Sequence, residues 1–350
     1  MKEIKVIMVG LGNVGQGFLK ILETDHASLM QNQGLDIKVV GVSDLRYGNY
    51  SEPNGFQVTS LLKALENGNL EGMGKKDERS STENWIKSCD AQFLLEASFT
   101  NFTNAEPAIQ YMRAALSSGK HVVTSNKGPI ALFYSELATM AKQGGLQIGV
   151  EGTVMSGTPS MALGINTLKA AGITSIQGIL NGTTNFILTR MEQGNSYQNA
   201  LAEAQKLGYA EADPTGDVEG YDAAGKVVIL GNLVMDRPIT FADVERKGIS
   251  GVTLQDVELA KAEGKRWKLI GTLSIDNGIV NASVKPTLLP TEDPLANVGG
   301  ATNAITFTTQ HMGKVTLIGA GAGRVETGFA LLSDILAISK TNEPSNWRKQ

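Results

Sequence analysis

Short apolar runs alternate with stretches of helical period over the first 150 residues of the chain. Ile4 to Val9 is an apolar run with β-branched residues, which is the pattern of a buried parallel strand. From Asn13 to Leu22 the apolar positions recur with the period of a helix. Further strands are predicted at 37–42, 91–96, 121–124 and 146–150, and further helices at 105–117 and 134–143. This alternation predicts βαβ units and a parallel sheet with helices on both faces.

The pattern changes after Glu151. A turn-rich segment at 152–159 precedes a predicted helix at 161–171, strands at 176–180, 279–286 and 304–309, and long helices between them. This order indicates an α+β region. We therefore expect a first domain at 1–145, a second at 146–318, and a C-terminal loop and helix at 319–350. The last helix, roughly 328–339, is too short to stand alone, so we expect it to fold back on one of the domains.

Two polar stretches interrupt the first domain. Residues 67–81 are rich in Gly, Lys, Asp, Glu and Ser, and we interpret them as a solvated loop. Residues 27–34 are interpreted as a polar insert that lengthens the connection before the strand at 37–42.

Composition places the chain among folded, soluble proteins. With 350 residues there is room for about two domains, and 41% apolar with 19% charged residues is typical of globular proteins. The net charge of -4 argues against nucleic acid as a partner, because phosphate binding needs a basic face. No apolar run approaches the roughly 18 residues that span a bilayer. Cys89 is the single cysteine, which excludes an internal disulfide and fits a reducing compartment, so we expect a cytoplasmic protein.

The strongest local motif is Gly-Leu-Gly-Asn-Val-Gly at residues 10–15. It directly follows a predicted strand and opens a predicted helix, which is the context that the G-x-G-x-x-G fingerprint requires. Gly10 makes the tight turn, Gly12 lets the backbone approach a pyrophosphate, and Gly15 lets helix pack on strand. The helix that begins at Asn13 and Val14 offers free N–H groups to the anion. The first domain is therefore predicted to be a Rossmann-type dinucleotide-binding domain.

The second predicted strand leads into Asp44, where an acid would bind the adenosine ribose. Asp44 favours NAD because its charge would repel a 2′-phosphate. Arg46, two residues further on, could instead pair with that phosphate. The sequence thus leaves NAD or NADP open, with a lean to NAD.

Two segments follow the ends of central strands, where ligands bind in open parallel sheets: Ser-Phe-Thr at 98–100 and Ser-Asn-Lys at 125–127. Lys127 at this edge could polarise a carbonyl and balance the charge of a developing alkoxide. It could equally be a solvated surface lysine, and position alone leaves both interpretations open.

A dense group of carboxylates lies shortly before Lys226. Its members are Glu211, Asp213, Asp217, Glu219 and Asp222. One interpretation is a solvated acidic loop before a helix, with Asp222 and Lys226 as an i, i+4 surface pair worth a few tenths of a kcal/mol. The other is a pocket for a substrate ammonium, with Lys226 as an acid–base group. Spacing alone leaves both open.

Together these motifs resemble the homoserine dehydrogenase family over nearly the whole chain. The matching segments are 10–15, 125–127, 151–159, 178–185, 207–214, 222–226 and 319–323. The resemblance implies a dinucleotide-binding domain joined to an α+β substrate and dimerisation domain, and a homodimer. It also implies NAD(P)-dependent interconversion of L-homoserine and L-aspartate 4-semialdehyde, a step of threonine and methionine biosynthesis.

The resemblance further implies roles for individual residues. Lys226 would be the proton donor and acceptor, with Lys127 beside the nicotinamide and the substrate oxygen. Glu211 and Asp222 would bind the amino group of homoserine, and Asp217 would help to hold the site.

Other implied contacts involve the cofactor and an ion. Ser98 and Gly323 would touch the cofactor, so the C-terminal helix would return to the nucleotide domain. A monovalent cation, usually sodium, would be held by the Glu151 carboxylate and by three backbone carbonyls, those of Val154, Ser156 and Thr158.

The chain also departs from the family pattern. Glu-Thr-Gly at 326–328 stands where the family usually has Thr-Ala, which bears on the cofactor contacts there. We expect no C-terminal regulatory module after residue 350, and so no threonine feedback through one.

Two other functions compete with this one. An aspartate dehydrogenase would share the nucleotide domain, but the segment 207–226 argues against it. A non-catalytic NAD-binding protein on the same scaffold would be favoured by the loss of a lysine, and both Lys127 and Lys226 are present.

Overall fold

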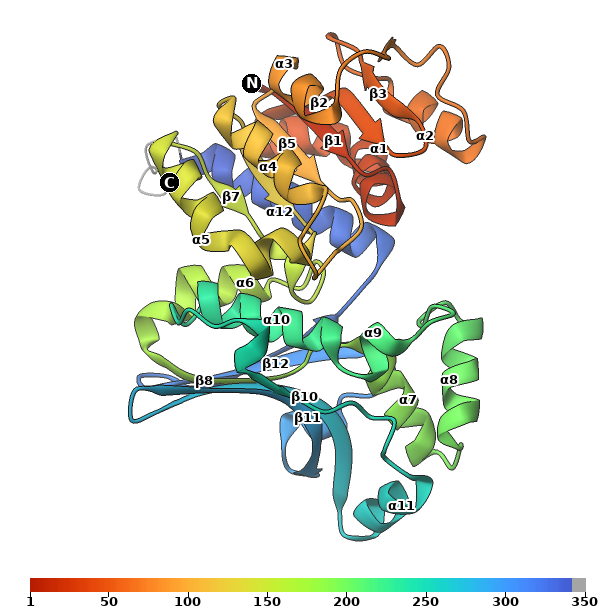
Figure 1. Ribbon diagram of the computed structural model, residues 1–350, viewed down its shortest axis with the longest axis vertical. Helices are drawn as coiled ribbons and strands as arrows, with labels where there is room; N and C mark the ends of the chain where they lie inside the picture. The colour runs from red at the N-terminus through yellow and green to blue at the C-terminus, as the bar shows by residue number, and fades with distance from the viewer. Residues whose placement is uncertain (342–350) are drawn as a thin grey trace. The chain divides into compact units, whose positions relative to one another are not determined.

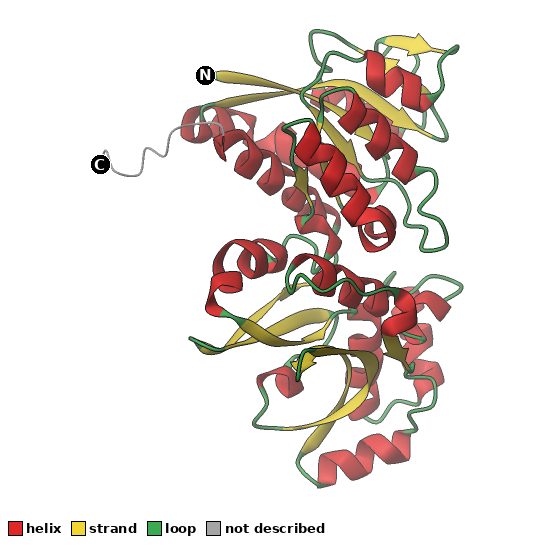
Figure 2. Ribbon diagram, turned by 60° about the vertical axis from the view of Figure 1, so that its left-hand side comes forward, coloured by secondary structure: helices red, strands yellow, loops and turns green. Residues whose placement is uncertain are grey.

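A computed structural model describes residues 1–341 and divides the chain into two compact units (Figures 1 and 2). The first unit contains residues 1–157 and the chain from residue 323 onward, and the second contains residues 158–322.

The first unit is built on a seven-stranded sheet in the order β4-β3-β2-β1-β5-β6-β7. Five neighbouring strands of this sheet pair in parallel. In chain order they are β1 (Lys2–Val9), β2 (Leu35–Asp44), β5 (Phe93–Glu96), β6 (His121–Thr124) and β7 (Ile148–Gly149). The predicted parallel sheet is confirmed. Two antiparallel strands extend it, β3 (Gly48–Ser51) and β4 (Lys75–Asp77). The interpretation of 67–81 as loop is therefore wrong for β4, whose polar residues are held by backbone pairing to β3.

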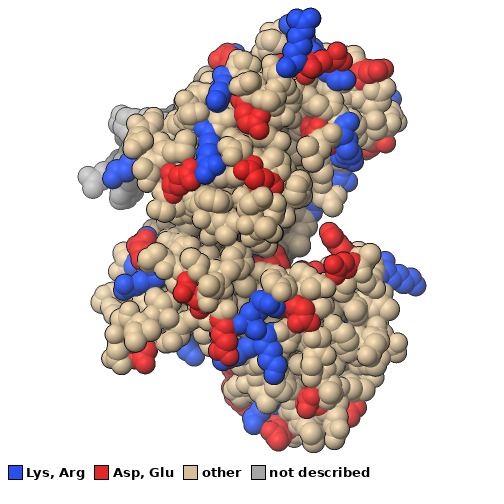
Figure 3. Space-filling view, in the orientation of Figure 1, with Lys and Arg blue, Asp and Glu red and all other residues tan. Residues whose placement is uncertain are grey.

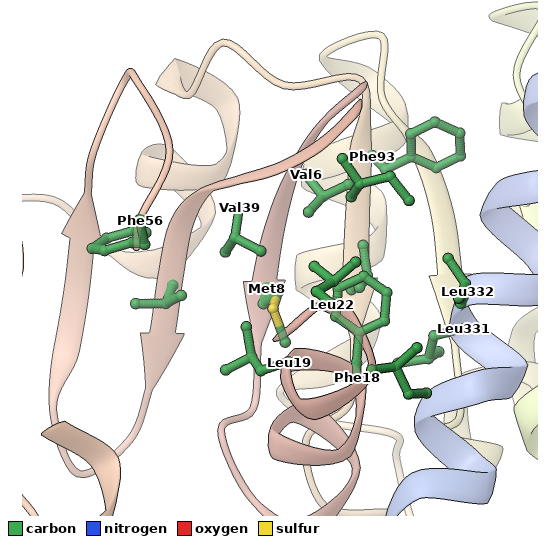
Figure 4. Close-up of a cluster of buried hydrophobic side chains, with 14 of the residues drawn as sticks. Val6, Met8, Phe18, Leu19, Leu22, Val39, Phe56, Phe93, Leu331 and Leu332 are labelled. Atoms are coloured by element: carbon green, nitrogen blue, oxygen red, sulfur yellow. The ribbon is translucent and has the colours of Figure 1, made fainter. Parts of the chain in front are cut away.

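Helices cover both faces of this sheet. They are α1 (Asn13–Gln33), α2 (Val58–Glu66), α3 (Thr82–Ser88), α4 (Ala108–Ser117), α5 (Lys127–Gln143) and α12 (Arg324–Thr341). On one face, Met8 of β1 packs with Phe18 of α1 and Leu331 of α12 (Figure 4). On the other face, Trp85 of α3 and Ile7 of β1 fill the space beside Gly41. The supposed polar insert at 27–34 is mostly the last turns of α1.

The boundaries of the first unit differ from those predicted. β7 still pairs with β6, so the boundary expected near residue 145 falls too early. At the other end, the chain rejoins the first unit at Gly323 rather than at 319. Because α12 packs along α1, the C-terminal helix belongs to the first unit.

The second unit has a six-stranded sheet in the order β13-β12-β8-β10-β11-β9. Its strands are β8 (Ile173–Ile179), β9 (Val244–Arg246), β10 (Lys265–Asp276), β11 (Ile279–Pro290), β12 (Thr302–Thr309) and β13 (Gly313–Ala320). All pair antiparallel except β9 with β11. The sequence pattern missed β9, β10 and β13.

Helices complete the second unit. They are α6 (Ser160–Ala162), which continues as a π-helix (Leu163–Leu168) and a 3-10 turn (Lys169–Ala171), α7 (Gly182–Glu192), α8 (Tyr197–Lys206), α9 (Thr215–Val218), α10 (Tyr221–Leu233) and α11 (Leu254–Ala262). Val227 of α10 packs against Gly271 of β10, so α10 lies on the sheet and is buried along most of its length.

Charged side chains of both signs are interspersed over the face of the molecule in Figure 3. Within the described residues, no helix combines the length and the apolar character needed to cross a membrane.

Candidate active site

The glycine motif forms a tight corner between β1 and α1. Gly10 has a φ of +94°, and a Cβ there would lie 2.4 Å from Ala97 O. A Cβ on Gly15 would lie 2.2 Å from Gly10 O, so helix and turn touch through backbone alone. Around Gly12, by contrast, a Cβ would meet nothing within 4 Å. The backbone at Gly12 is therefore accessible, and the first turn of α1, which follows it, presents free N–H groups.

A cavity of about 790 Å³ in the first unit adjoins this corner. Its lining includes five residues that the sequence predicted for the cofactor: Gly10, Gly12, Asp44, Arg46 and Ser98. The volume is within the roughly 300–1,000 Å³ range of small-molecule and cofactor sites. The cavity also takes in residues of β4 and the following turn, which the sequence had assigned to a solvated loop.

Asp44 is fixed at the end of β2 by three hydrogen bonds. Its Oδ2 accepts from Leu11 N at 2.9 Å, and its Oδ1 accepts from Arg46 N at 3.0 Å and Arg46 Nε at 3.1 Å. Burial disfavours the charged form, but the hydrogen bonds from Arg46 N, Leu11 N and the Arg46 side chain, together with the Arg46 charge, outweigh it, so the pKa of Asp44 lies below its usual value. Asp44 is thus a fixed carboxylate, and in this structure Arg46 pairs with it.

Lys127 is the first residue of α5, directly after its capping residue Asn126. The Asn126 side chain accepts from Gly128 N at 3.1 Å and donates to Phe99 O at 2.9 Å. These bonds join the ends of β5 and β6, so Ser98 and Lys127 lie in two segments that are tied together. Asn126 was not singled out from the sequence, although Asn before a helix is a recognised capping signal.

In the second unit, Lys226 of α10 lies in a polar cluster. Its side chain is 8% exposed, and Nζ donates to Asp222 Oδ2 at 2.7 Å and to Leu180 O at 2.6 Å. The interpretation of this pair as a surface ion pair is therefore wrong. An ammonium has three N–H groups, and these two bonds use two of them.

Asn181 connects the carboxylate of Asp217 to this cluster, and Thr183 lies beside that carboxylate. Asn181 Nδ2 donates to Asp217 Oδ1 at 2.7 Å and to Asp222 Oδ2 at 3.0 Å, and Thr183 Oγ1 lies 3.1 Å from Asp217 Oδ2. Burial raises the pKa of Asp217, and the Asp222 carboxylate raises it further. Asp217, Asp222 and Lys226 thus form one hydrogen-bonded group. The roles of Asn181 and Thr183 were missed because amide and hydroxyl side chains carry no signal of their own.

Glu211 does not join this group. Its side chain is exposed, and Gln205 Nε2 donates to its backbone carbonyl rather than to its carboxylate.

The segment 151–158 makes a strained turn. Met155 and Ser156 have φ values of +61° and +55°, which is uncommon for residues other than glycine. Ser156 Oγ lies 2.7 Å from Thr327 Oγ1 of α12, and Glu151 N donates to Asp334 Oδ2 of α12 at 2.9 Å. Burial raises the pKa of Asp334 well above its usual value, and the nearby Glu151 carboxylate raises it further.

If the turn at 151–158 binds a cation, its ligands can only be carboxylate and backbone oxygens. No cluster of three or more His, Cys, Asp or Glu side chains suited to a metal occurs within residues 1–341. The buried Glu151 carboxyl and the partly buried Asp334 carboxyl, beside a sharply turned backbone, form an oxygen-only donor set, which fits a hard cation. Thr158, the fourth predicted ligand, is the first residue of the second unit.

Gly323 lies where α12 begins, next to the first turns of α1. Thr327 N donates to Gly323 O at 3.1 Å, and Arg324 donates to the Gln16 side chain. The residues Glu326, Thr327 and Gly328, which depart from the expected Thr-Ala, make contacts within the same unit with Gly157, Ser156 and Phe18.

Comparison with known proteins gives a consistent answer over the whole chain. The model of "Homoserine dehydrogenase, NAD binding domain" matches residues 10–151, and that of "Homoserine dehydrogenase" matches residues 159–336. An NAD(+)-dependent homoserine dehydrogenase of Pseudomonas canavaninivorans is 44% identical over 97% of each chain.

Two solved structures are similar in fold and sequence. A homoserine dehydrogenase from Thiobacillus denitrificans has a TM-score of 0.85 and 33% identity, covering 99% of this chain and 76% of that one. A hyperthermophilic archaeal homoserine dehydrogenase mutant in complex with NADPH has a TM-score of 0.83 and 30% identity, covering 99% of this chain and 100% of that one. With two domain models and a relative at this identity along its length, the chain belongs to the homoserine dehydrogenase family.

Proposed function

We propose that this chain interconverts L-homoserine and L-aspartate 4-semialdehyde with Lys226 as the acid–base group. The observation that carries the proposal is the buried Lys226 ammonium, held by Asp222 and Leu180 O with a third N–H left for a ligand. In the reductive direction the ammonium gives a proton to the developing alkoxide. In the oxidative direction the neutral amine takes the hydroxyl proton, and Asp222 keeps the nitrogen in place in both.

The cofactor and Lys127 complete this proposal. When bound, the nicotinamide would supply or accept the hydride that is exchanged at the terminal carbon of the substrate. Lys127, at the start of α5, would stabilise the charge on the substrate oxygen, since a cation placed where charge develops lowers the barrier. Ser98 and Gly323 would contact the cofactor. Their support is that Ser98 lines the cavity beside the glycine corner and that Gly323 adjoins α1.

The acidic residues of the second unit would bind the ammonium of the amino-acid substrate. We assign this role to Asp222 and Glu211, and the support of the site to Asp217. Asp217 is suited to a supporting role because Asn181 already donates to its Oδ1, while its Oδ2 lies 3.1 Å from Thr183 Oγ1, which donates its own proton to Tyr209 O at 2.6 Å. The Glu211 side chain is exposed and would have to turn toward the substrate when it binds.

For the cofactor we propose a preference for NAD over NADP. Asp44 is held ionised at the place where a 2′-phosphate would come, and Arg46 is already paired with it. The Pseudomonas relative, which is named as NAD(+)-dependent, favours the same choice, whereas the archaeal structure is of a mutant enzyme in complex with NADPH.

We further propose that a monovalent cation, sodium, is held by the Glu151 carboxylate and by the carbonyls of Val154, Ser156 and Thr158, an oxygen-only donor set that suits a hard cation. The burial of Glu151 and the consecutive left-handed residues 155 and 156 support this site. Its role would be to neutralise Glu151 and to hold the turn.

A homodimer is proposed as the working assembly. Exposed apolar side chains of the second sheet, Leu288 of β11 and Ile318 of β13, provide surface for association. Light scattering after size exclusion, at several protein concentrations, tests this.

The central experiment is oxidation of L-homoserine by the purified full chain, followed at 340 nm with NAD and with NADP. We expect reduction of NAD with L-homoserine and none with L-aspartate. Absence of activity with either cofactor would overturn the proposed reaction.

A further inference from the structure

Glu96 is a fully buried carboxyl group that lies beside the cavity at the glycine corner and takes no part in the proposed reaction steps. It is the last residue of β5, in the middle of the parallel sheet, and its exposed fraction is 0%. Its partners in the sheet register are Val9 of β1 and Thr124 of β6. Glu96 therefore stands at the point where the glycine corner, Ser98 and Lys127 come together in the chain's first unit.

One side of the Glu96 carboxyl holds the turn that carries Ser98. Its Oε1 accepts from Ser98 N at 3.1 Å and from Ser98 Oγ. The same turn supports the glycine corner, because the backbone of Ala97 and Ser98 occupies the space beside Gly10, within 2.6 Å of a Cβ built there. A shift of residues 97 and 98 would therefore move the phosphate-binding turn as well.

The other side of the carboxyl is linked to α5. Thr124 Oγ1 lies 3.3 Å from Glu96 Oε2, and it accepts from Asn126 N at 2.9 Å. Asn126 in turn caps α5 and donates to Phe99 O at 2.9 Å. Lys127 follows Asn126 directly, so its backbone position depends on this chain of bonds.

We propose that Glu96 is a positioning residue that fixes Ser98 and, through Thr124 and Asn126, Lys127, and that it does so by hydrogen bonding rather than by charge. This inference rests on the roles proposed above for Ser98 and Lys127.

A count of the protons available for hydrogen bonding supports the neutral form of the Glu96 carboxyl. Thr124 has one hydroxyl proton, and its shorter bond, at 2.9 Å, is to the backbone oxygen of Glu96. The 3.3 Å contact to Oε2 is then satisfied when the carboxyl is protonated and donates to Thr124 Oγ1, which can accept from both Glu96 and Asn126. Burial acts in the same direction: it raises the pKa of Glu96 above its usual value and outweighs the hydrogen bonds from Ser98, Thr124 and the Asn126 side chain, which lower that pKa.

The test compares Glu96→Gln with Glu96→Ala in the full chain. A glutamine has a carbonyl that can accept from Ser98 and an amide that can donate to Thr124, so it replaces a neutral acid group for group. We expect Glu96→Gln to keep kcat and the KM for NAD within about threefold of the parent. We expect Glu96→Ala to lower kcat by about 10- to 100-fold, the scale on which small misplacements of reacting groups act. If Glu96→Gln loses as much activity as Glu96→Ala, the charge is required and the proposal is overturned.

Two further variants keep the test decisive if Glu96→Ala does not fold. Thr124→Val preserves shape but cuts the link to Asn126, and we expect it to lower kcat while the KM for NAD stays near the parent value. Ser51→Ala is the matched control, because it removes the hydrogen bond that Trp85 Nε1 donates to Ser51 Oγ at 2.8 Å, in the same unit but away from the cavity beside the glycine corner. It should change neither parameter. An unchanged kcat in Thr124→Val would overturn the link to α5.

A double-mutant cycle separates this proposal from the one on which it rests. If Glu96 acts through Lys127, the effects of Thr124→Val and Lys127→Ala should not add. Combining Thr124→Val with Lys127→Ala should then lower kcat little beyond the value for Lys127→Ala alone. Full additivity would overturn the proposed route. If instead Lys127→Ala and Ser98→Ala leave kcat and the KM for NAD unchanged, the roles assigned to those residues fail, whatever the Glu96 variants do.

Discussion

Gly328 of α12 lies directly on the backbone of Gly17 in α1. A Cβ on Gly328 would be 2.5 Å from Gly17 C, and a Cβ on Gly17 would be 1.8 Å from Arg324 O. The two helices therefore meet at a point where only glycine fits. This contact fixes the C-terminal helix against the helix whose N-terminus forms the phosphate-binding corner.

Gly17→Ala should destabilise the first unit. In an exposed helix this change would stabilise by about 1 kcal/mol, but here the methyl group would meet backbone, and overpacking costs about 1–3 kcal/mol. We expect a lower midpoint of thermal unfolding and faster hydrogen exchange in α12. Gly251→Ala, where a Cβ would meet nothing within 4 Å, is the control. Equal unfolding midpoints for the two variants would contradict the close contact.

Lys226→Ala should lower kcat for homoserine oxidation by at least about 10²-fold, the usual scale for losing an acid–base group. The matched control is Lys169→Ala, because Lys169 also forms a 2.7 Å ion pair with an aspartate of the second unit, Asp236, but at the surface. Lys169→Ala should leave kcat unchanged. Near-normal turnover of Lys226→Ala would remove this lysine from the mechanism.

Asp44→Asn should shift the cofactor preference toward NADP. The amide oxygen can still accept from Leu11 N, but the charge that would oppose a 2′-phosphate is gone, and Arg46 loses its ionised partner. We expect the ratio of kcat/KM for NADP to that for NAD to rise about 10- to 100-fold. Adding Arg46→Ala should reverse the gain. A ratio that stays constant through both variants would show that Asp44 does not set the preference.

Sodium should stabilise the folded chain if Glu151 binds it. An ion present at ten times its Kd would add about 1.4 kcal/mol to the free energy of unfolding. We expect a higher midpoint of thermal unfolding in NaCl than in choline chloride at equal ionic strength. Glu151→Gln should abolish the difference, and its persistence in that variant would place the effect elsewhere.

Glu96→Gln should also change the pH dependence of stability. Burial raises the pKa of Glu96 in the folded state above the value of about 4.3 expected when unfolded. Between these two pKa values the folded state holds a proton that the unfolded state has lost, so the stability of the parent falls as pH rises. The Glu96→Gln variant has no titrating group at this position, so its stability does not fall with pH for this reason. Its stability relative to the parent should therefore increase from about pH 4.5 upward, measured by urea unfolding. Parallel curves would mean that Glu96 has an ordinary pKa.

The sequence by itself determined the parts of the fold that depend on local pattern. The apolar run before residue 10, its glycine motif and the helix from Asn13 predicted the strand–turn–helix corner, because turn geometry and helix period are properties of consecutive residues. The family was also readable from segments such as 207–214 and 222–226. Short or polar strands could not be predicted in this way, because β4 and β13 are held by pairing with their neighbours in the sheet rather than by their own composition.

Only the tertiary structure decided how distant residues share a site. It buried Lys226 against Leu180 O and joined Asp217 to Asp222 through Asn181, which turned an ambiguous acidic stretch into a hydrogen-bonded cluster. It also gave Glu96 its partners, and it placed α12 against α1. Burial and hydrogen bonding between segments far apart in the chain depend on how the elements pack, and spacing along the sequence does not encode that.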